Sequence, residues 1–330
     1  MDFGYQRALT RRRWLALGAA TALEAISTPV LAGEGYPSRP IRVIVPFPAG
    51  GTTDRTVRAL TQLAAGAMGQ SFVIENKPGG STLIAAQALM RAKSDGYTIG
   101  IVPMTLNRLR ALGKTQIDAA NDFSFIARVV GQTHGLVARS DRSYRSVADI
   151  VAAAKERPGH ITYATSGVAS ITHAAMEDFA DRASIQLRHV PFKGGPESLH
   201  ALLGGEVDLM AESPIWASEV DSGRCRLLAI WNEQRLARYP SVPTMKELGH
   251  PLVFDGTVGL GGPAGIKDPM LARLRQVFKQ AIQSTEFEAE CDKLLAPVLY
   301  LDGDGFRRYA LENLIQERAL VQRLKFKLME

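Results

Sequence analysis

The hydrophobic pattern of this chain alternates short apolar runs with longer amphipathic stretches. The runs are three to five residues long and often rich in Val and Ile, as strands are, whereas the stretches repeat their apolar positions every three or four residues, as helices do. In the first third of the chain the predicted strands are residues 41–45, 72–75 and 98–102, and the predicted helices are residues 53–68 and 81–92. This alternation predicts a parallel α/β layer that forms one lobe.

A second series with the same alternation begins after Gly131. Its predicted strands are residues 135–138, 161–163, 189–192, 207–210 and 226–230, and its predicted helices are residues 146–156, 170–181 and 197–203. Ser146 is the expected N-cap of the first of these helices. The series predicts a second α/β lobe.

The last 70 or so residues are mainly helical in pattern. The predicted helices are residues 269–283, 285–295 and 303–325, with a short apolar run at residues 298–301. We expect them to pack on the first lobe, so that the chain crosses between lobes near residues 131–135 and 255–259 and forms a two-strand hinge. The expected organisation is lobe I in residues 33–134 and 257–330, and lobe II in residues 135–256.

Residues 1–32 have the three parts of an export signal. Arg11, Arg12 and Arg13 are followed by a largely apolar stretch at residues 14–25, and residues 30–32 (Val-Leu-Ala) offer a cleavage site. The stretch is shorter than the roughly 20 residues that span a bilayer. A signal peptide is therefore expected, of either the general secretory or the twin-arginine type, and it places the protein in the periplasm.

Composition narrows the class of partner. The formal net charge is only +6, and the basic residues are scattered without aromatic residues between them, so a nucleic-acid partner is not expected. The chain has two cysteines, Cys225 and Cys291, which we expect in different lobes and unpaired. About 300 residues after the signal suffice for two domains.

Two junctions between a strand and a helix carry the candidate chemistry. In residues 46–54, the pair Gly50-Gly51 lets the backbone approach a ligand, and Thr52, Thr53 and the helix N-terminus offer hydrogen-bond donors to an anion. The alternative is a tight turn with Thr52 or Thr53 as N-cap. Residues 163–170 form a similar loop before the helix that bears His173. Neither loop has the Lys-Ser/Thr ending of a nucleotide-binding P-loop.

Several segments in this order resemble the Bug-type extracytoplasmic solute receptors of tripartite tricarboxylate transporters. The likeness runs from about Tyr36 to the C-terminus. Its segments are residues 36–41 (YPSRPI), 46–54 (PFPAGGTTD), 75–80 (ENKPGG), 94–98 (SDGYT), 163–170 with His173, 190–196 (VPFKGGP), 204–208 (GGEVD) and 239–244 (YPSVPT). The resemblance implies a type II periplasmic binding protein fold, with two α/β lobes joined by a double crossover.

The resemblance also implies that backbone amides and hydroxyls of the two loops hold a ligand carboxylate. The candidate ligand-binding residues are Phe47, Ala49, Gly50, Gly51, Thr52, Asp54, Met104, Thr105, Ser166, Gly167, Val168, Ala169, Ser170, His173, Lys193 and Glu212. The sequence departs from the family at Ala169, where glycine is usual, and at Ala211-Glu212, where Phe-Asp is common. We expect Ala211 and the nearby Trp216 to reshape the pocket wall.

Three candidate side chains keep alternative interpretations. His173 and Glu177 are four residues apart, but no further metal ligands are in evident range, so no metal is expected; His173 lines the cleft or bonds a nearby carbonyl. Lys193 pairs with a ligand carboxylate, or is a solvated charge or a backbone tether. Glu212 points away from the pocket, pairs with a base, or binds an amine or hydroxyl of the ligand.

Three classes of function fit a two-lobed cleft. A hydrolase would need an activated nucleophile, yet the chain has no G-x-S-x-G motif and neither cysteine lies in an activating motif. A sensor would bind its ligand in the same way as a transport receptor and differ only in the partner. We favour a monomeric receptor without cofactor, which closes around a small organic acid and presents it to the membrane subunits of a transporter.

Overall fold

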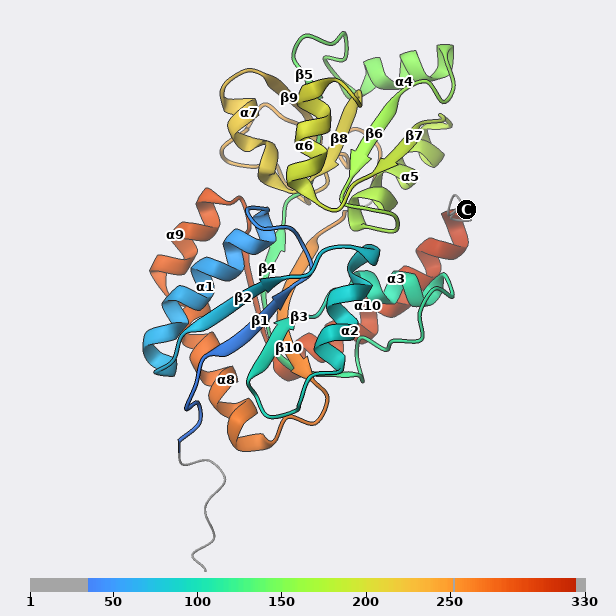
Figure 1. Cartoon of the computed structure of the whole chain (residues 1–330). Coiled ribbons are helices and arrows are strands. Elements are labelled where there is room, and N and C mark those ends of the chain that lie inside the picture. Colours follow the sequence, from blue (N-terminus) through green and yellow to red (C-terminus); the bar gives the residue numbers. More distant parts are fainter. Residues whose placement is uncertain (1–34, 252, 325–330) are drawn as a thin grey trace, which may run out of the picture. The chain divides into compact units, whose positions relative to one another are not determined.

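The computed structural model describes residues 35–251 and 253–324, of which the part from Tyr36 onward is one compact unit. This unit contains two β-sheets with helices on both faces, which we call the first and second lobe (Figure 1). The strand order is β11-β4-β10-β3-β1-β2 in the first sheet and β7-β6-β8-β5-β9 in the second. The predicted two-lobed α/β fold is confirmed.

The first sheet combines three parallel and three antiparallel strands. Its strands are β1 (Ile41–Val45), β2 (Phe72–Asn76), β3 (Thr98–Ile101), β4 (Phe123–Gln132), β10 (Gly256–Pro263) and β11 (Val298–Asp302). Apolar residues alternate between its faces: Val43 and Val45 pack in one core and Ile44 in the other. One face is covered by α1 (Thr52–Met68), α8 (Asp268–Ile282) and α9 (Thr285–Lys293), and the other by α2 (Leu83–Met90), α3 (Thr105–Ala111) and α10 (Gly303–Leu324).

The second sheet has its own two cores. Its strands are β5 (Gly135–Arg139), β6 (Thr162–Thr165), β7 (Arg188–Pro191), β8 (Leu209–Glu212) and β9 (Cys225–Ile230). Its helices are α4 (Val147–Glu156), α5 (Ile171–Ala183), α6 (Gly195–Gly204) and α7 (Ala217–Asp221), with the short turn η2 (Pro214–Trp216) before α7. Ser146 caps α4, as predicted, and forms a reciprocal capping box with Asp149.

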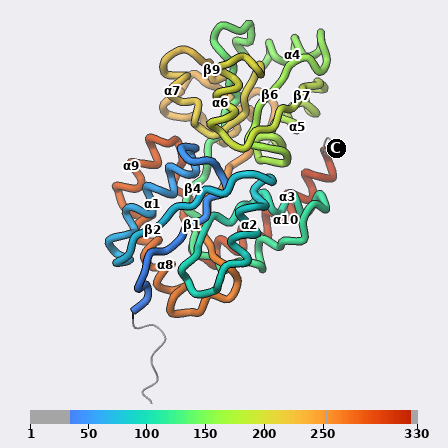
Figure 2. The backbone as a smooth tube through the Cα atoms, viewed as in Figure 1, coloured from blue at the N-terminus to red at the C-terminus, as the bar shows by residue number. Residues whose placement is uncertain are grey.

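The backbone passes between the two sheets twice (Figure 2). It leaves the first sheet after β4 and enters β5 two residues later, and it returns from β9 to β10. After β10, the helices α8, α9 and α10 pack on the first sheet, as the sequence predicts. The exact lobe boundaries, residues 33–134 with 257–330 against 135–256, stay a prediction, and the expected signal in residues 1–32 lies outside the described residues.

The structure contains elements that the sequence pattern does not predict, among them the ten-residue strand β4 and the short helices α3 and α7. The predicted helix at residues 81–92 is a single turn η1 (Gly80–Thr82) followed by the shorter α2. Ser81 and Thr82 have φ values of 51° and 77°, which break the helix between them and Leu83.

Both cysteines are free and buried, and they belong to different cores. Cys225 packs in the second lobe and Cys291 in the first. Within residues 35–251 and 253–324, no helix combines the length and the apolar character that crossing a membrane requires.

Candidate functional site

A cavity of about 60 Å³ lies where loops of the two lobes meet. The first lobe contributes residues that follow β1, β2, β3 and β4, and the second lobe contributes residues that follow β6, β7 and β8. The lining residues are Phe47, Pro48, Gly51, Thr52, Thr53, Ser81, Thr82, Thr105, Gln132 and His134 on one side, and Ser166, Val168, Ser170, Ile171, Gly195, Pro196, Glu212 and Ser213 on the other.

Three helices begin at this cavity. Gly51 is the N-cap of α1 and Gly194 is the N-cap of α6, and neither glycine has a side chain that could accept a hydrogen bond from the first-turn amides. The third helix, α5, is capped by Ser170, whose hydroxyl accepts from the His173 amide. The free amides and the helix dipoles give this cavity a positive potential without any cationic side chain. Among the described residues that line it, none is Lys or Arg.

The N-cap of α1 is Gly51 and not one of the two threonines that the sequence offers as alternatives. Its backbone is extended, at φ −67° and ψ 162°, which is usual for an N-cap residue. The hydroxyl of Thr53 accepts a hydrogen bond from Gln132 at the end of β4, over 2.9 Å. Thr53 therefore fixes the helix start to the end of β4, and it lines the cavity together with Gly51 and Thr52.

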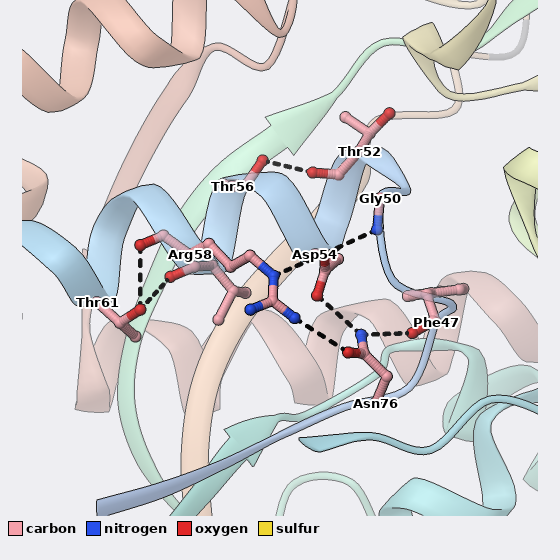
Figure 3. Close-up of polar contacts among 9 residues, drawn as sticks. Phe47, Gly50, Thr52, Asp54, Thr56, Arg58, Thr61 and Asn76 are labelled. Atoms are coloured by element: carbon pink, nitrogen blue, oxygen red, sulfur yellow. Dashed lines mark hydrogen bonds and ion pairs between the residues drawn. The ribbon is translucent and has the colours of Figure 1, made fainter. Parts of the chain in front are cut away.

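Asp54 stabilises the first loop, residues 46–54, through three hydrogen bonds (Figure 3). Its buried carboxylate accepts hydrogen bonds from the Gly50 amide at 2.9 Å, from Asn76 at 2.8 Å and from Arg58 at 2.9 Å. Burial raises the pKa of this carboxyl, but the hydrogen bonds from Arg58, Asn76 and Gly50 outweigh burial and hold the pKa below its usual value. The Gly50 amide is thus used inside the loop, and neither Gly50 nor Asp54 lines the cavity.

Asp54→Asn should lower the free energy of unfolding by about 1–3 kcal/mol, because the new amide group turns a donor toward Arg58 and Asn76, which are also donors. The folded pKa of Asp54 lies below its unfolded pKa, so its contribution is complete above pH ~4 and disappears as the pH falls through the folded value. Urea unfolding should therefore show a constant difference between wild type and variant from pH 5 to 7, and a smaller one below pH 4. A difference that stays the same in acid would contradict this role.

The second loop, residues 163–170, uses both polar backbone groups of Ala169 for internal contacts. Ala169 has φ 57°, in the left-handed region, and its amide donates to Nδ1 of His173 over 3.0 Å. Its carbonyl accepts from Arg108 of α3 over 2.9 Å, which ties the loop to the first lobe. The residue that replaces the usual glycine, Ala169, therefore has an amide that is already hydrogen-bonded to His173. The residues of this loop that line the cavity are Ser166, Val168 and Ser170.

His173 supports the loop and is not part of the cavity wall. Its ring stacks on His189, with centroids 3.9 Å apart, and its Nε2 lies 3.8 Å from a carboxylate oxygen of Glu177. Burial lowers the pKa of His173 to about 3, and burial likewise lowers the pKa of His189 and of the cavity residue His134 to about 4. All three rings are neutral near pH 7. No group of three or more His, Cys, Asp or Glu in the described part of the chain is placed to hold a metal ion.

The α6 N-terminus meets the first loop at very short range. A Cβ at Gly194 would lie 2.5 Å from Cδ of Pro48, and a Cβ at Gly51 would lie 3.7 Å from Cδ of Pro196. Glycine at position 194 thus permits the two lobes to approach each other at the cavity.

Gly194→Ala should weaken ligand binding, because the added methyl group holds the lobes apart. The backbone at Gly194 is extended, with φ 168°, so alanine causes no strain within the second lobe itself. Overpacking of this kind costs about 1–3 kcal/mol, which is roughly a five- to 150-fold rise in Kd. Calorimetric titration measures this rise in Kd. Gly66→Ala is the control, because nothing lies within 4 Å of a Cβ at this exposed helical position. Equal affinities in the two variants would show that the lobes need not approach.

Glu212 lines the cavity and, among the described residues, forms no ion pair, so the alternatives in which it points away or pairs with a base do not hold. Oε2 accepts from the Ser213 amide over 3.1 Å, and the backbone carbonyl accepts from Nε1 of Trp216 over 2.9 Å. Ala211 and Trp216 do not line the cavity, and their expected effect on the shape of the pocket wall stays a prediction. Both side chains are fully buried in the cores of the second lobe, where they position β8 and the turn after it.

The remaining predicted residues lie around this cavity. Phe47 and Thr105 line it, whereas Ala49 is exposed outside it. Gly167 and the exposed Lys193 line an adjoining cavity of about 350 Å³. Met104 lines a second adjoining cavity of about 70 Å³, which shares Thr53 and Thr105 with the first. The assignment of all sixteen residues to ligand binding stays a prediction.

Sequence reasoning did not select several lining residues. Ser81 and Thr82 follow β2, Gln132 and His134 lie at the first crossover, and Gly195, Pro196 and Ser213 follow β7 and β8. The sequence does contain a local signal for Gly195 and Pro196, because Gly-Gly-Pro after a strand is typical of a helix start whose N-cap has no side chain. The others come to the cavity through long-range topology.

Comparison with known proteins adds independent findings. Residues 56–326 match the model of the family described as "Tripartite tricarboxylate transporter family receptor". The protein BugT of Bordetella pertussis is 31% identical over 274 residues, which cover 81% of this chain and 83% of BugT. Two solved structures from Rhodopseudomonas palustris are also similar: MatC with bound malate (25% identity, 87% of this chain and 100% of that chain, TM-score 0.81) and Rpa4515 with adipate (26% identity, 88% and 98%, TM-score 0.82).

Proposed function

The chain belongs to the family of tripartite tricarboxylate transporter receptors, and from this membership we propose that it is a periplasmic binding protein for a small organic carboxylate. The ligand would bind in the cavity between the lobes, and the closed protein would present it to the membrane subunits of a transporter.

The observation that carries this proposal is the convergence of α1, α5 and α6 on one cavity without a cation. Each helix N-terminus has roughly half a positive elementary charge, and carboxylates bind at such sites through free amides. The amides of Thr52 and Thr53 in α1, and of Gly195 in α6, are the expected donors to the ligand carboxylate. The acids bound by the two R. palustris proteins, malate and adipate, have this chemistry.

The acids bound by the two similar solved structures point to an aliphatic ligand. Malate and adipate are aliphatic dicarboxylates. The cavity of about 60 Å³ shares Phe47, Thr82 and Ser166 with the adjoining cavity of about 350 Å³, which leaves room for the chain of such an acid. We therefore place short aliphatic mono- and dicarboxylates ahead of aromatic acids.

We propose binding and not catalysis as the activity. Burial raises the pKa of the Cys225 thiol to about 11 and that of Cys291 to about 12, so neither thiol is a ready nucleophile. The one ring nitrogen donor of the cavity, His134, has its Nδ1 3.3 Å from the Phe254 carbonyl, and no nucleophile is paired with it among the residues described. The proposal includes a monomeric protein, export by a signal in residues 1–32, and lobes with the predicted boundaries.

A thermal-shift screen of the protein against mono-, di- and tricarboxylates, aromatic acids and amino acids tests the function. A ligand that binds only the folded state raises the melting temperature, by an amount that grows with its concentration over Kd. We expect the largest rise with a short aliphatic carboxylate. A rise with amino acids or aromatic acids alone would contradict the proposed ligand class, and no rise with any compound would contradict the function.

A further inference from the structure

Two polar atoms on the cavity wall lack a hydrogen-bond partner among the described residues. One is Oγ1 of Thr82 in the first lobe, and the other is Oε1 of Glu212 in the second lobe. Both residues are well buried, with 6% and 3% of their surface exposed. Buried polar atoms are nearly always paired in folded proteins, so these two atoms indicate where a ligand supplies the missing partners.

Two contacts fix the backbone of Glu212 and one fixes its side chain. The strand pairing of β8 with β5 places Glu212 opposite Gly135, Trp216 holds its backbone carbonyl, and the Ser213 amide binds Oε2. Across the carboxyl lies the start of α6, where a Cβ on Gly195 would be only 3.6 Å from Oε2. Oε1 is thus the atom of this carboxyl that remains for a ligand.

In the described part of the chain, no positive side chain compensates a charge on Glu212. From the crossover it meets His134, which is neutral near pH 7. From the second loop it meets Ser166, and from the α6 N-terminus Gly195 and Pro196, none of which carries a charge.

The charged groups near this part of the cavity are either exposed to solvent or paired with other residues. Lys193 and Glu197 are exposed, the guanidinium of Arg108 binds Glu317, and His189, behind Thr165, is neutral near pH 7. Burial raises the pKa of Glu212 to about 7, although the hydrogen bond from Ser213 and the nearby polar groups of Ser166 oppose this rise.

An incoming carboxylate makes an ionised Glu212 still less favourable, because two like charges in one buried site repel each other. We propose that Glu212 binds the ligand in its protonated form, donating its O–H to a carboxylate oxygen, so that the anion enters the cavity together with one proton. The Thr82 hydroxyl provides a donor from the opposite lobe. This inference rests on the proposed function and narrows the ligand class to acids without an ammonium group at this end.

The proposal predicts the direction of pH dependence. The bound form contains protonated Glu212, so affinity is constant where free Glu212 is protonated and falls as the pH rises above the pKa of the free protein. The fall approaches tenfold per pH unit for one linked proton. At pH 8 the wild type should bind about tenfold more weakly than at pH 6, with uptake of nearly one proton per ligand.

Calorimetric titration at pH 6 and pH 8, in buffers with different ionisation heats, measures both affinity and proton uptake. The probe is malate, adipate or whichever acid of the screening panel gives the largest thermal shift. Glu212→Gln keeps a donor and the side-chain volume but cannot ionise. It should bind about as tightly as wild type at pH 6, about tenfold more tightly at pH 8, and without proton uptake. Glu206→Gln, an exposed position in the same lobe, should keep the wild-type profile.

Three outcomes would overturn the proposal. Wild-type binding without proton uptake would show that Glu212 is ionised in the complex. Affinity that rises with pH, together with a hundredfold loss in Glu212→Gln at both pH values, would show that Glu212 accepts a hydrogen bond from an ammonium or hydroxyl group. In both of these cases the protein still binds an acid, so the proposed receptor function is not contradicted. If no acid binds to any variant, the proposed function fails as well.

Discussion

Gly51→Asp is expected to raise the Kd for the ligand at least about a hundredfold while leaving the protein folded. Gly51 already has the backbone conformation of an N-cap residue, and aspartate is among the best N-caps. The new carboxylate would accept hydrogen bonds from the first-turn amides of α1, which are the amides proposed for the ligand. It would also repel the ligand charge. Each lost charge-assisted hydrogen bond costs about 1.5–3 kcal/mol, so two suffice for the stated loss.

Calorimetric titration and thermal unfolding of Gly51→Asp separate binding from stability. The melting temperature without ligand should stay the same or rise, because the cap adds about 1 kcal/mol to the helix. Gly51→Ala is the matched control: it places the same Cβ 3.3 Å from the Pro48 carbonyl oxygen but adds no charge. We expect a loss of less than tenfold for alanine. Unchanged affinity in Gly51→Asp would rule out the α1 terminus as the anion site.

Arg108→Met is expected to lower the free energy of unfolding by about 3–5 kcal/mol, the usual cost of removing one partner of a buried ion pair. The Arg108 side chain is 2% exposed and donates to both carboxylate oxygens of Glu317, over 2.7 and 2.6 Å. It also donates to the Ala169 carbonyl. Methionine would leave the Glu317 charge and this carbonyl buried without a partner, in the segment that connects α3, α10 and the second loop.

Urea unfolding measures this loss. Arg235→Met, which removes an exposed pair with Glu247, should cost no more than about 1 kcal/mol. The double variant Arg108→Met/Glu317→Leu should recover most of the stability, because it removes the uncompensated charge. A small effect of Arg108→Met, similar to that of Arg235→Met, would mean that Glu317 is hydrated or protonated and that the pair does not stabilise the fold.

Local patterning predicted the alternation of strands and helices, but not β4. This strand contains Arg128 between buried apolar residues, and an arginine in such a run argues against a central strand. The structure resolves the conflict at long range. Arg128 pairs with Asp255, 127 residues away, and its guanidinium lies 4.4 Å from the centre of the Tyr309 ring. No local sequence window contains these partners.

The same limit explains which parts of the site were predictable. Glycine-rich turns before helices identified the α1 and α5 termini, because their chemistry is local. Two loop amides are hydrogen-bonded within the protein: that of Gly50 donates to Asp54, and that of Ala169 donates to His173. These bonds depend on how each loop folds back on its own helix. Thr82 and Gln132 reach the cavity only through the arrangement of strands, and the orphaned oxygen of Glu212 becomes visible only once the neighbours of β8 are known.

The central claim is that the α1 and α6 N-termini hold a ligand carboxylate, and a crystal structure of the complex tests it most directly. With the acid that gives the largest thermal shift, the account predicts carboxylate oxygens about 2.7–3.2 Å from the amide nitrogens of Thr52 or Thr53 and of Gly195. A ligand bound away from these helix ends, or one held by a lysine or arginine side chain, would contradict the account.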